Sequence, residues 1–515
     1  MNILVPYIKA SYPIIYLQTA EENRGEMTIF EAAKKCKRGL EVWSCTEGFI
    51  EIGANGAEAL DEETDPGEAL QAIKDRPGKK IFVFRDFHSF LKNPVIRRLI
   101  RDIAKDFRQT QKTLIIISPV SEIPKELEKD ISLIEFDLPG KEEIFQIFNA
   151  LYSGNKKKIG VIEDDEIERI VQAAMGLTTD EAEAAFSKAL VERAEAKKAG
   201  EEEVKPISKM VLGEKALAVK KTGILEYFEA AETAKDVGGL QNLKKWLMIR
   251  SKAFSKKARD FKLPMPRGIL LVGLPGCGKS LSAKATSNIL GVPLIRFDVG
   301  RVFGGLVGQS EANLRTAIQT VEAVGNCVLW IDEMDKAFSG MGGGSTDGGT
   351  SQRVFGNFIT WMQEKTAPVF IVATVNRIEG LPPELLRKGR FDEIFFVGLP
   401  STKEREEILN IHVKKYGRDP SEVFAEGVDS CVEASKDFSG AELEESIVSA
   451  LYSAFYKEEE ISAKGIEVAI NQTNPLAKSK SKQLDHMAAW ASKNAVNASV
   501  IDNPGDTSAG RQLDL

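Results

Sequence analysis

The feature that most constrains this chain is a glycine-rich segment, GLPGCGKS at 273–280, which directly follows an apolar run at 268–272. The order of strand, glycine-rich turn, Lys-Ser and helix-forming segment is that of a phosphate-binding loop, whose backbone N–H groups surround nucleotide phosphates. We expect Lys279 to reach the β- and γ-phosphates and the Ser280 hydroxyl to bind Mg²⁺. A glycine-rich turn without a ligand is the alternative, but this combination favours nucleotide binding. The predicted contacts are Gly273, Pro275, Gly276, Cys277, Gly278, Lys279, Ser280 and Leu281.

Two further apolar runs end in polar residues that suit the same chemistry. Residues 327–331 precede Asp332 and Glu333. Asp332 is placed to hold Mg²⁺, and Glu333 to orient and deprotonate an attacking water. The alternative is that the two acids only begin the next helix. Residues 368–375 precede Asn376, which can bind the water or the γ-phosphate, although an asparagine there also serves as a turn residue.

Together with LPPELLRKGRFD at 381–392, these motifs resemble those of the AAA branch of the AAA+ ATPases. The resemblance implies that Arg387 and Arg390 are arginine fingers, which reach the γ-phosphate bound by a neighbouring subunit and stabilise the transition state. A structural salt bridge is the alternative for Arg390. The resemblance also implies adenine contacts by Asp236, Val237 and Gly238, a ribose contact by His412, and a sensor region at Gly440 and Ala441. The segment at 439–440 equally suits a helix N-cap.

A narrower resemblance covers most of the chain. The segments 301–308, 353–361 and 387–400 are similar to those of poorly characterised AAA ATPases of cyanobacteria and algal plastid genomes. This implies an ATP-hydrolysing protein that binds ATP with Mg²⁺, assembles as a homo-oligomeric ring, most often a hexamer, and remodels a protein client. The alternative is a regulatory switch or scaffold whose ATP-dependent assembly is the output. A hydrolytic set that includes Glu333, Asn376 and Arg390 favours the first.

The segment that would face the centre of such a ring departs from the pattern of polypeptide-threading members. Those members carry an aromatic-Val-Gly loop, and here the matching residues are Leu306, Val307 and Gly308. A leucine offers less rigid contact area than tyrosine or phenylalanine, so local remodelling is favoured over processive threading. A second glycine-rich segment at 339–350 is either a pore-facing loop or a connector without function.

The first two hundred residues repeat the layout of the ATPase segment without its chemistry. Apolar runs at 12–17, 81–87 and 113–118, and the segment 134–139, follow in the same order as their ATPase counterparts. No glycine-rich loop follows the first run, and Phe87 stands where the catalytic base would be. Glu21 and Glu22 lie where phosphates would bind, which disfavours nucleotide there. We interpret this as a degenerate AAA+-like domain; the alternative is any doubly wound α/β domain.

The predicted fold class is therefore α/β: a P-loop AAA+ module, with a parallel sheet between helices and a helical lid, preceded by a degenerate AAA+-like α/β domain. The predicted boundaries are 1–200 for the degenerate domain, 201–230 for a linker, 231–399 for the large ATPase subdomain, 400–475 for the lid and 476–515 for a partly disordered tail.

The composition restricts which ligands the protein is expected to bind and in which cellular compartment it is expected. A net charge of −7 without an extended basic block makes nucleic acid an improbable ligand. Five cysteines without a C-x-x-C pair indicate a reducing compartment, and three scattered histidines argue against zinc. Cys277 is either passive or sensitive to oxidation. No apolar run is long enough to span a membrane or act as a secretory signal, so we expect the cytoplasm, or the plastid stroma for a plastid-encoded gene.

Overall fold

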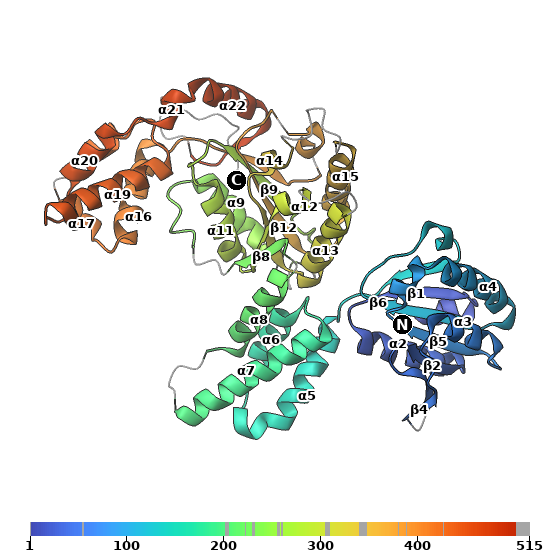
Figure 1. The fold of residues 1–515 in the computed structure, drawn as a ribbon. Helices are drawn as coiled ribbons and strands as arrows, with labels where there is room; N and C mark the ends of the chain where they lie inside the picture. Colours follow the sequence, from blue (N-terminus) through green and yellow to red (C-terminus); the bar gives the residue numbers. More distant parts are fainter. Residues whose placement is uncertain are drawn as a thin grey trace. The chain divides into compact units, whose positions relative to one another are not determined.

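The computed structural model describes residues 2–53, 56–200, 205–221, 223–228, 232–254, 258, 261–303, 309–338, 348–379, 381–387, 389–425 and 427–500. The chain forms two compact units (Figure 1). Unit 1 contains Met1–Gln172 and Leu177–Ile207, and unit 2 contains Ala173–Gly176 and Ser208–Leu515.

Unit 1 begins with a sheet of strand order β4-β3-β2-β5-β6-β1-β7. Strands β2, β5, β6, β1 and β7 run parallel, while β3 and β4 are antiparallel additions at one edge. Apolar side chains fill both faces, as expected for parallel strands covered by helices on each side. The strands are β1 (Ile14–Gln18), β2 (Gly39–Ser44), β3 (Gly48–Gly53), β4 (Gly56–Asp61), β5 (Lys80–Arg85), β6 (Thr113–Ser118) and β7 (Ile131–Glu135).

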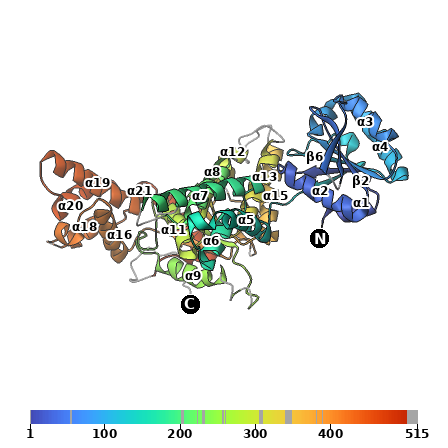
Figure 2. The ribbon, with the colours of Figure 1, turned by 90° about the horizontal axis from the view of Figure 1, so that it is seen from below.

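Helices cover both faces of this sheet, with α1 and α2 packing on one side and α3 and α4 on the other (Figure 2). Three more helices, α5 to α7, follow the last strand, and Phe148 of α5 packs edge-on against Phe186 of α7 at 5.2 Å. The helices are α1 (Leu4–Lys9), α2 (Glu22–Cys36), α3 (Pro66–Asp75), η1 (Phe87–Lys92), α4 (Pro94–Thr110), η2 (Lys125–Leu127), α5 (Lys141–Ile159), α6 (Asp164–Ala174) and α7 (Thr179–Ala199).

Unit 2 contains a second sheet, of order β14-β13-β9-β12-β11-β10-β8. Only β8 is antiparallel to its neighbour among these strands. The strands are β8 (Leu225–Phe228), β9 (Gly268–Gly273), β10 (Leu294–Phe297), β11 (Cys327–Ile331), β12 (Val369–Val375), β13 (Glu393–Val397) and β14 (Val496–Asn497).

Helices α9 and α11 pack on one face of this second sheet, and α13, α15 and α22 pack on the other. The large subdomain contains α8 (Ile207–Lys221), α9 (Gln241–Ser251), η3 (Lys252–Phe254), α11 (Lys279–Leu290), α12 (Val299–Phe303), α13 (Gln309–Val324), α14 (Met334–Phe338), α15 (Gly348–Glu364) and η4 (Pro383–Leu386).

A helical lid with its own apolar core follows β13, and the chain then returns to the sheet. The lid helices are α16 (Thr402–Lys415), α17 (Pro420–Val423), α18 (Asp429–Ala434), α19 (Gly440–Tyr456) and α20 (Ala463–Gln472). They are followed by α21 (Leu476–Ser479) and α22 (Ser481–Asn494), after which β14 pairs with β13. The ranges predicted as linker and tail therefore contain α8, β8, α21, α22 and β14, while 501–515 lies outside the described residues.

The two sheets share the order of their five central parallel strands. The series β7-β1-β6-β5-β2 in unit 1 matches β13-β9-β12-β11-β10 in unit 2. The predicted α/β fold class is confirmed: the sheet that carries the phosphate loop, with its helical lid, is preceded by an α/β domain of the same strand order. One detail of the repeat was wrong. The left-handed backbone of Glu333 (φ 48°) has its counterpart at Asp86 (φ 49°), so Asp86, not Phe87, holds that position.

Candidate nucleotide-binding site

A cavity of about 1020 Å³ opens at the carboxyl ends of β9, β11 and β12. The phosphate loop, the 232–240 segment, α16 and the start of α19 all line it. Ligands of open parallel sheets bind at this end of the strands. Most of the predicted site residues line this cavity: Asp236, Val237, Gly238, Pro275, Gly276, Cys277, Gly278, Lys279, Ser280, Leu281, Asp332, Glu333, Asn376, His412, Gly440 and Ala441.

The phosphate loop has the backbone that a phosphate cradle requires. Gly276 (φ 83°) and Gly278 (φ 89°) adopt left-handed conformations that L side chains rarely take. A Cβ at Gly276 would also lie 2.9 Å from Ser439 Oγ, so a residue with a side chain would crowd the lid at this position. Helix α11 begins directly afterwards, and its first residues, Lys279, Ser280 and Leu281, line the cavity, as at an anion-binding helix N-terminus. The loop therefore fits the phosphates of a nucleotide.

Lys279 lies inside the loop with its amine turned toward the backbone. Nζ donates to the carbonyls of Gly273 (2.8 Å) and Leu274 (2.7 Å), and the side chain is 5% exposed. Burial lowers the pKa of Lys279 to about 8. An anionic phosphate nearby would favour the ammonium form. Gly273, at the end of β9, contributes through this carbonyl rather than by lining the cavity.

The two predicted magnesium ligands lie side by side. Ser280 Oγ donates to Asp332 Oδ1 at 3.1 Å. Mg²⁺ commonly takes one or two protein oxygens and completes its octahedron with phosphate oxygens and water, so this pair fits the ion. Among the described residues no cluster of three or more metal-binding side chains occurs.

Thr374, which the sequence analysis did not single out, connects the two acids. Its hydroxyl donates to Asp332 Oδ1 (2.7 Å) and accepts from the Glu333 N–H (2.9 Å). Thr374 is 1% exposed within β12, where it looks like one more core position of an apolar strand. Its signal in the sequence is that it is the only hydroxyl in the strand that ends next to Asn376.

Glu333 and Asn376 are held together at the mouth of the cavity. Asn376 Nδ2 donates to Glu333 Oε1 at 3.1 Å, and Lys336 Nζ lies 2.5 Å from Glu333 Oε2. The Asn376 N–H donates to Asp335 Oδ1 at 3.1 Å, so Asp335 also helps to position the amide. The Glu333 carboxylate and the Asn376 amide can thus form hydrogen bonds to the same water molecule.

The segment 236–240, which also lines the cavity, is held in place by α16, the first helix of the lid. Gly239 N–H donates to Glu407 (2.8 Å), and Leu240 N–H donates to Glu404 (2.8 Å). A Cβ at Gly238 would lie 2.5 Å from the side chain of Ile408. The Asp236 carboxylate accepts two hydrogen bonds from Thr233, which lower the pKa of Asp236. The sequence analysis missed both glutamates because charged residues on a helix usually face solvent.

His412 brings an unsatisfied polar atom into the cavity. Its Nδ1 is buried and finds no hydrogen-bond partner within the described part of the chain, the nearest carboxylate oxygen, Glu444 Oε1, being 3.7 Å away. Burial lowers the pKa of His412, so the ring is neutral at pH 7. A buried polar atom of this kind calls for a partner, which a nucleotide can supply. The lid also contacts the phosphate loop directly, through Ala441 N–H and the Gly276 carbonyl (3.1 Å).

Cys277 is passive in this environment. Burial raises the pKa of its thiol to about 11, which leaves almost none of the reactive thiolate at neutral pH.

The two arginines lie apart from the cavity of their own chain. Arg387 is exposed directly after η4, and Arg390 donates to the carbonyl of Glu384 in the same segment. The predicted pore segment at 306–308 and most of the glycine-rich segment at 339–350 fall outside the described ranges.

Comparison with protein families matches three consecutive parts of the chain. The N-terminal domain of SpoVK-like AAA ATPases matches 2–136, the second domain of the same proteins matches 142–222, and the AAA family (ATPase family associated with various cellular activities) matches 269–399. An "Uncharacterized AAA domain-containing protein ycf46" of Guillardia theta is 39% identical over 493 residues, which cover 94% of this chain and 93% of that protein. The ycf46 protein of Trieres chinensis is 38% identical over 96% of this chain and 97% of its own length. This chain belongs to the SpoVK-like AAA ATPases.

The domain boundaries of these AAA ATPases agree with the structure at one point. The first match ends directly after β7, and the second begins at α5, so the N-terminal sheet and the helices that follow are separate modules in the family. A more distant relative, the "Putative ribosome biogenesis ATPase nvl" of Dictyostelium discoideum, is 36% identical over 182 residues, or 34% of this chain and 21% of its own. No helix in the described ranges is long and apolar enough to cross a bilayer.

Proposed function

We propose that this AAA ATPase hydrolyses ATP, assembles into a homo-oligomeric ring, expected to be a hexamer, and remodels a protein client in the cytoplasm or plastid stroma. The observation that carries the proposal is the division of its catalytic groups. Lys279, Asp332 and Glu333 line the cavity, whereas Arg387 and Arg390 lie away from it. A second copy would have to supply the arginines, which is what a ring provides.

The proposal gives each of these cavity residues a role that its position supports. With nucleotide bound, the ammonium of Lys279 would bind the β- and γ-phosphates, and Ser280 with Asp332 would hold Mg²⁺, which would neutralise phosphate charge. Once the Glu333 carboxylate releases Lys336, it would orient the water and accept its proton. Asn376 fixes the water or the γ-phosphate.

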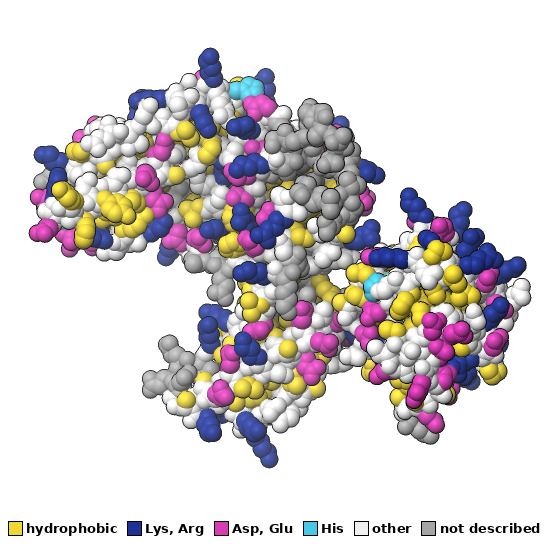
Figure 3. Space-filling view, in the orientation of Figure 1, with side chains coloured by type: hydrophobic (Ala, Val, Ile, Leu, Met, Phe, Trp, Pro, Cys, Tyr) yellow, Lys and Arg dark blue, Asp and Glu magenta, His cyan; other side chains and the backbone are white. Residues whose placement is uncertain are grey.

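The face of the molecule seen in Figure 3 gives no separate support for a nucleic-acid client. Over the lid and the ATPase subdomain, basic and acidic side chains are interspersed on the face seen in Figure 3, and no continuous basic stripe crosses it there. A nucleic-acid binder usually carries such a stripe. We therefore retain a protein as the client.

The test is mass photometry of the wild type and of Glu333→Gln, with and without ATP, together with phosphate release. We expect an ATP-dependent ring in both proteins and turnover only in the wild type. Glu364→Gln, an exposed acid on α15, is the matched control and should behave as the wild type. A monomer that still hydrolyses ATP would refute assembly of the site between subunits. A ring with no turnover in the wild type would instead establish a switch or scaffold.

A further inference from the structure

The N-terminal domain has, at the position of the phosphate loop, a short connection that ends in a buried acid. Only residues 19–21 separate β1 from α2, where 274–278 separate β9 from α11 in the ATPase. Glu21 is the last of the three and is 5% exposed. This connection has neither the length nor the glycines to surround a phosphate.

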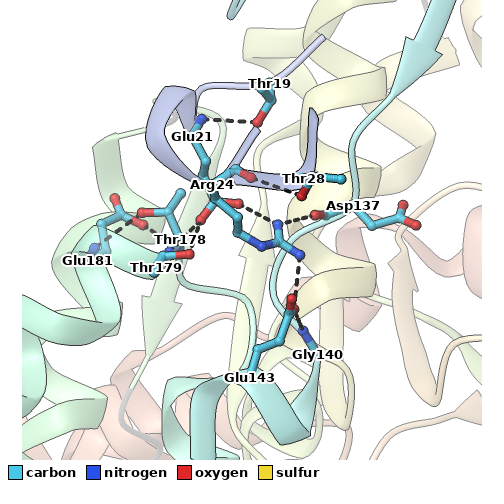
Figure 4. A network of polar contacts seen from close by, with 10 residues as sticks. All are labelled: Thr19, Glu21, Arg24, Thr28, Asp137, Gly140, Glu143, Thr178, Thr179 and Glu181. Carbon is cyan, nitrogen blue, oxygen red and sulfur yellow. Dashed lines mark hydrogen bonds and ion pairs between the residues drawn. The ribbon is translucent and has the colours of Figure 1, made fainter. Parts of the chain in front are cut away.

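The Glu21 carboxylate lies at the start of helix α7 (Figure 4). Oε1 accepts from the N–H of Thr179, the first residue of that helix, and from Thr179 Oγ1 at 2.7 Å. Oε2 forms an ion pair with Arg24 at 2.8 Å. A helix start with unpaired N–H groups and a positive dipole end, joined by a guanidinium, is an anion site. Here its ligand belongs to the protein itself.

Arg24 extends the same network to helix α5. Its guanidinium donates to the carbonyl of Asp137 (2.5 Å) and to Glu143 Oε2 (2.9 Å), and it stacks over the ring of Phe136 at 4.5 Å. Glu143 in turn accepts from the N–H of Gly140, at the N-terminus of α5 (2.9 Å). Glu21 and Arg24, both from the first module, thus bind the first turns of α7 and α5, the two long helices of the second module (Figure 4).

The ATPase has the corresponding junction, but there a backbone carbonyl of the phosphate loop, and no carboxylate, meets the helix start. Ser439 begins α19 with the same capping box as Thr178 at α7, and Ala441 N–H donates to the Gly276 carbonyl of the phosphate loop. Beside this contact, Gly440 and Ala441 line the nucleotide cavity. In the N-terminal domain the carboxylate of Glu21 occupies it.

We propose that Glu21 is a built-in substitute for a nucleotide phosphate. Its carboxylate, with Arg24, latches α5 and α7 onto the first sheet, so this junction is permanently closed and does not respond to ATP. Unit 1 then moves as a rigid body whatever nucleotide the ATPase holds. The proposal does not depend on ring assembly or on the client.

Hydrogen exchange of the full-length protein tests the latch. In the wild type we expect equal exchange at 179–183 with and without ATP, while the corresponding ATPase segment, 440–444, becomes protected by ATP. Glu21→Gln should accelerate exchange at 179–183 about tenfold, because a neutral amide oxygen accepts weaker hydrogen bonds than a carboxylate and forms no ion pair with Arg24. Glu31→Gln is the matched control, because Glu31 is exposed on α2, the helix that follows Glu21, and this substitution should leave the exchange rates unchanged.

Two outcomes would overturn the latch. Protection of 179–183 by ATP in the wild type would show that the junction responds to nucleotide. This comparison uses only the wild type, so it does not depend on whether a variant folds. Unchanged exchange in a folded Glu21→Gln protein would show that the carboxylate holds nothing. Equilibrium dialysis adds an independent measurement: the wild type should bind one ATP per chain and Lys279→Ala none, and a second nucleotide retained by Lys279→Ala would contradict an internally filled site.

Discussion

At the scale of single residues, the nucleotide site depends on side chains of two kinds. The loop, the two acids and Asn376 were predictable, because phosphate chemistry restricts residue type and spacing. Thr374, Glu404 and Glu407 were not, because they act by holding other groups. A threonine in an apolar strand and a glutamate on a helix have commoner explanations, and only the folded chain shows what they touch.

Replacing Thr374 tests whether this residue positions Asp332 and Glu333. Thr374→Val keeps the volume but leaves the Asp332 carboxylate and the Glu333 N–H without their hydroxyl partner. We expect phosphate release to fall by about 10- to 100-fold, since hydrogen bonds to charged groups contribute about 1.5–3 kcal/mol. Thr374→Ser keeps the hydroxyl and should retain most activity. Equal activity in the serine and valine variants would remove Thr374 from this role.

The pKa of Lys279 predicts how binding depends on pH. Burial lowers it to about 8 in the free protein, and bound phosphates raise it, so MgATP binding must take up a proton near and above pH 8. Affinity is therefore full below pH 8 and declines as the pH rises through it. Calorimetry at pH 8.5 in buffers of different ionisation enthalpy should detect this uptake, and at pH 7 it should fall to about a tenth of a proton. Equal uptake at both values would contradict this assignment.

At the scale of secondary-structure elements, the sequence predicted the central strands well and the last elements poorly. Three apolar runs in each half of the chain were expected as strands, and they correspond to β1, β5 and β6 in the first sheet and to β9, β11 and β12 in the second. The strands β2 and β10 and the order of the strands within each sheet were not predicted. The two-residue strand β14 is too short to show any periodicity. Nothing in the sequence of α22 says that Gln483 donates to the Asn376 carbonyl (3.3 Å) or that Met487 enters the ATPase core.

Helix α22 should therefore contribute to the stability of the ATPase. Met487 is 1% exposed, and Met487→Ala should lower the free energy of unfolding by about 2–5 kcal/mol, the usual cost of emptying a buried methionine site. Met248→Ala, at a methionine that is 53% exposed, is the control and should change it by less than about 0.5 kcal/mol. The measurement is urea denaturation, following the transition that MgATP shifts. Similar effects of the two substitutions would place α22 outside the cooperative core.

At the scale of the whole molecule, the strand order argues that one module was duplicated and that one copy lost its chemistry. Strand order and left-handed turns agree between the two sheets, while the loop, the base and the arginines are confined to one. The proposed finger role of Arg390 belongs to this scale too, because it would join one subunit to the site of the next.

Mixing subunits tests that role. Arg390→Ala should retain ATP binding, and in mixtures with the wild type the phosphate-release rate should fall below the weighted mean, because each variant subunit disables its neighbour's site. Arg98→Ala, at an exposed arginine paired with Asp102 on α4, should give strictly additive rates. Additive rates for Arg390→Ala would show that the arginine serves only its own chain.

The left-handed turn at Asp86 shows what inheritance preserves when a protein copy loses its task. In the ATPase the same turn presents Glu333 to the cavity, and selection on catalysis explains it. Asp86 has the same backbone conformation in a domain that has no phosphate loop, and its N–H donates to the Ile117 carbonyl (2.9 Å), which joins β5 to β6. A bend that looks like part of the catalytic equipment is thus equally a property of the sheet. Evolution could discard the chemistry residue by residue while strand pairing kept the ancestral outline.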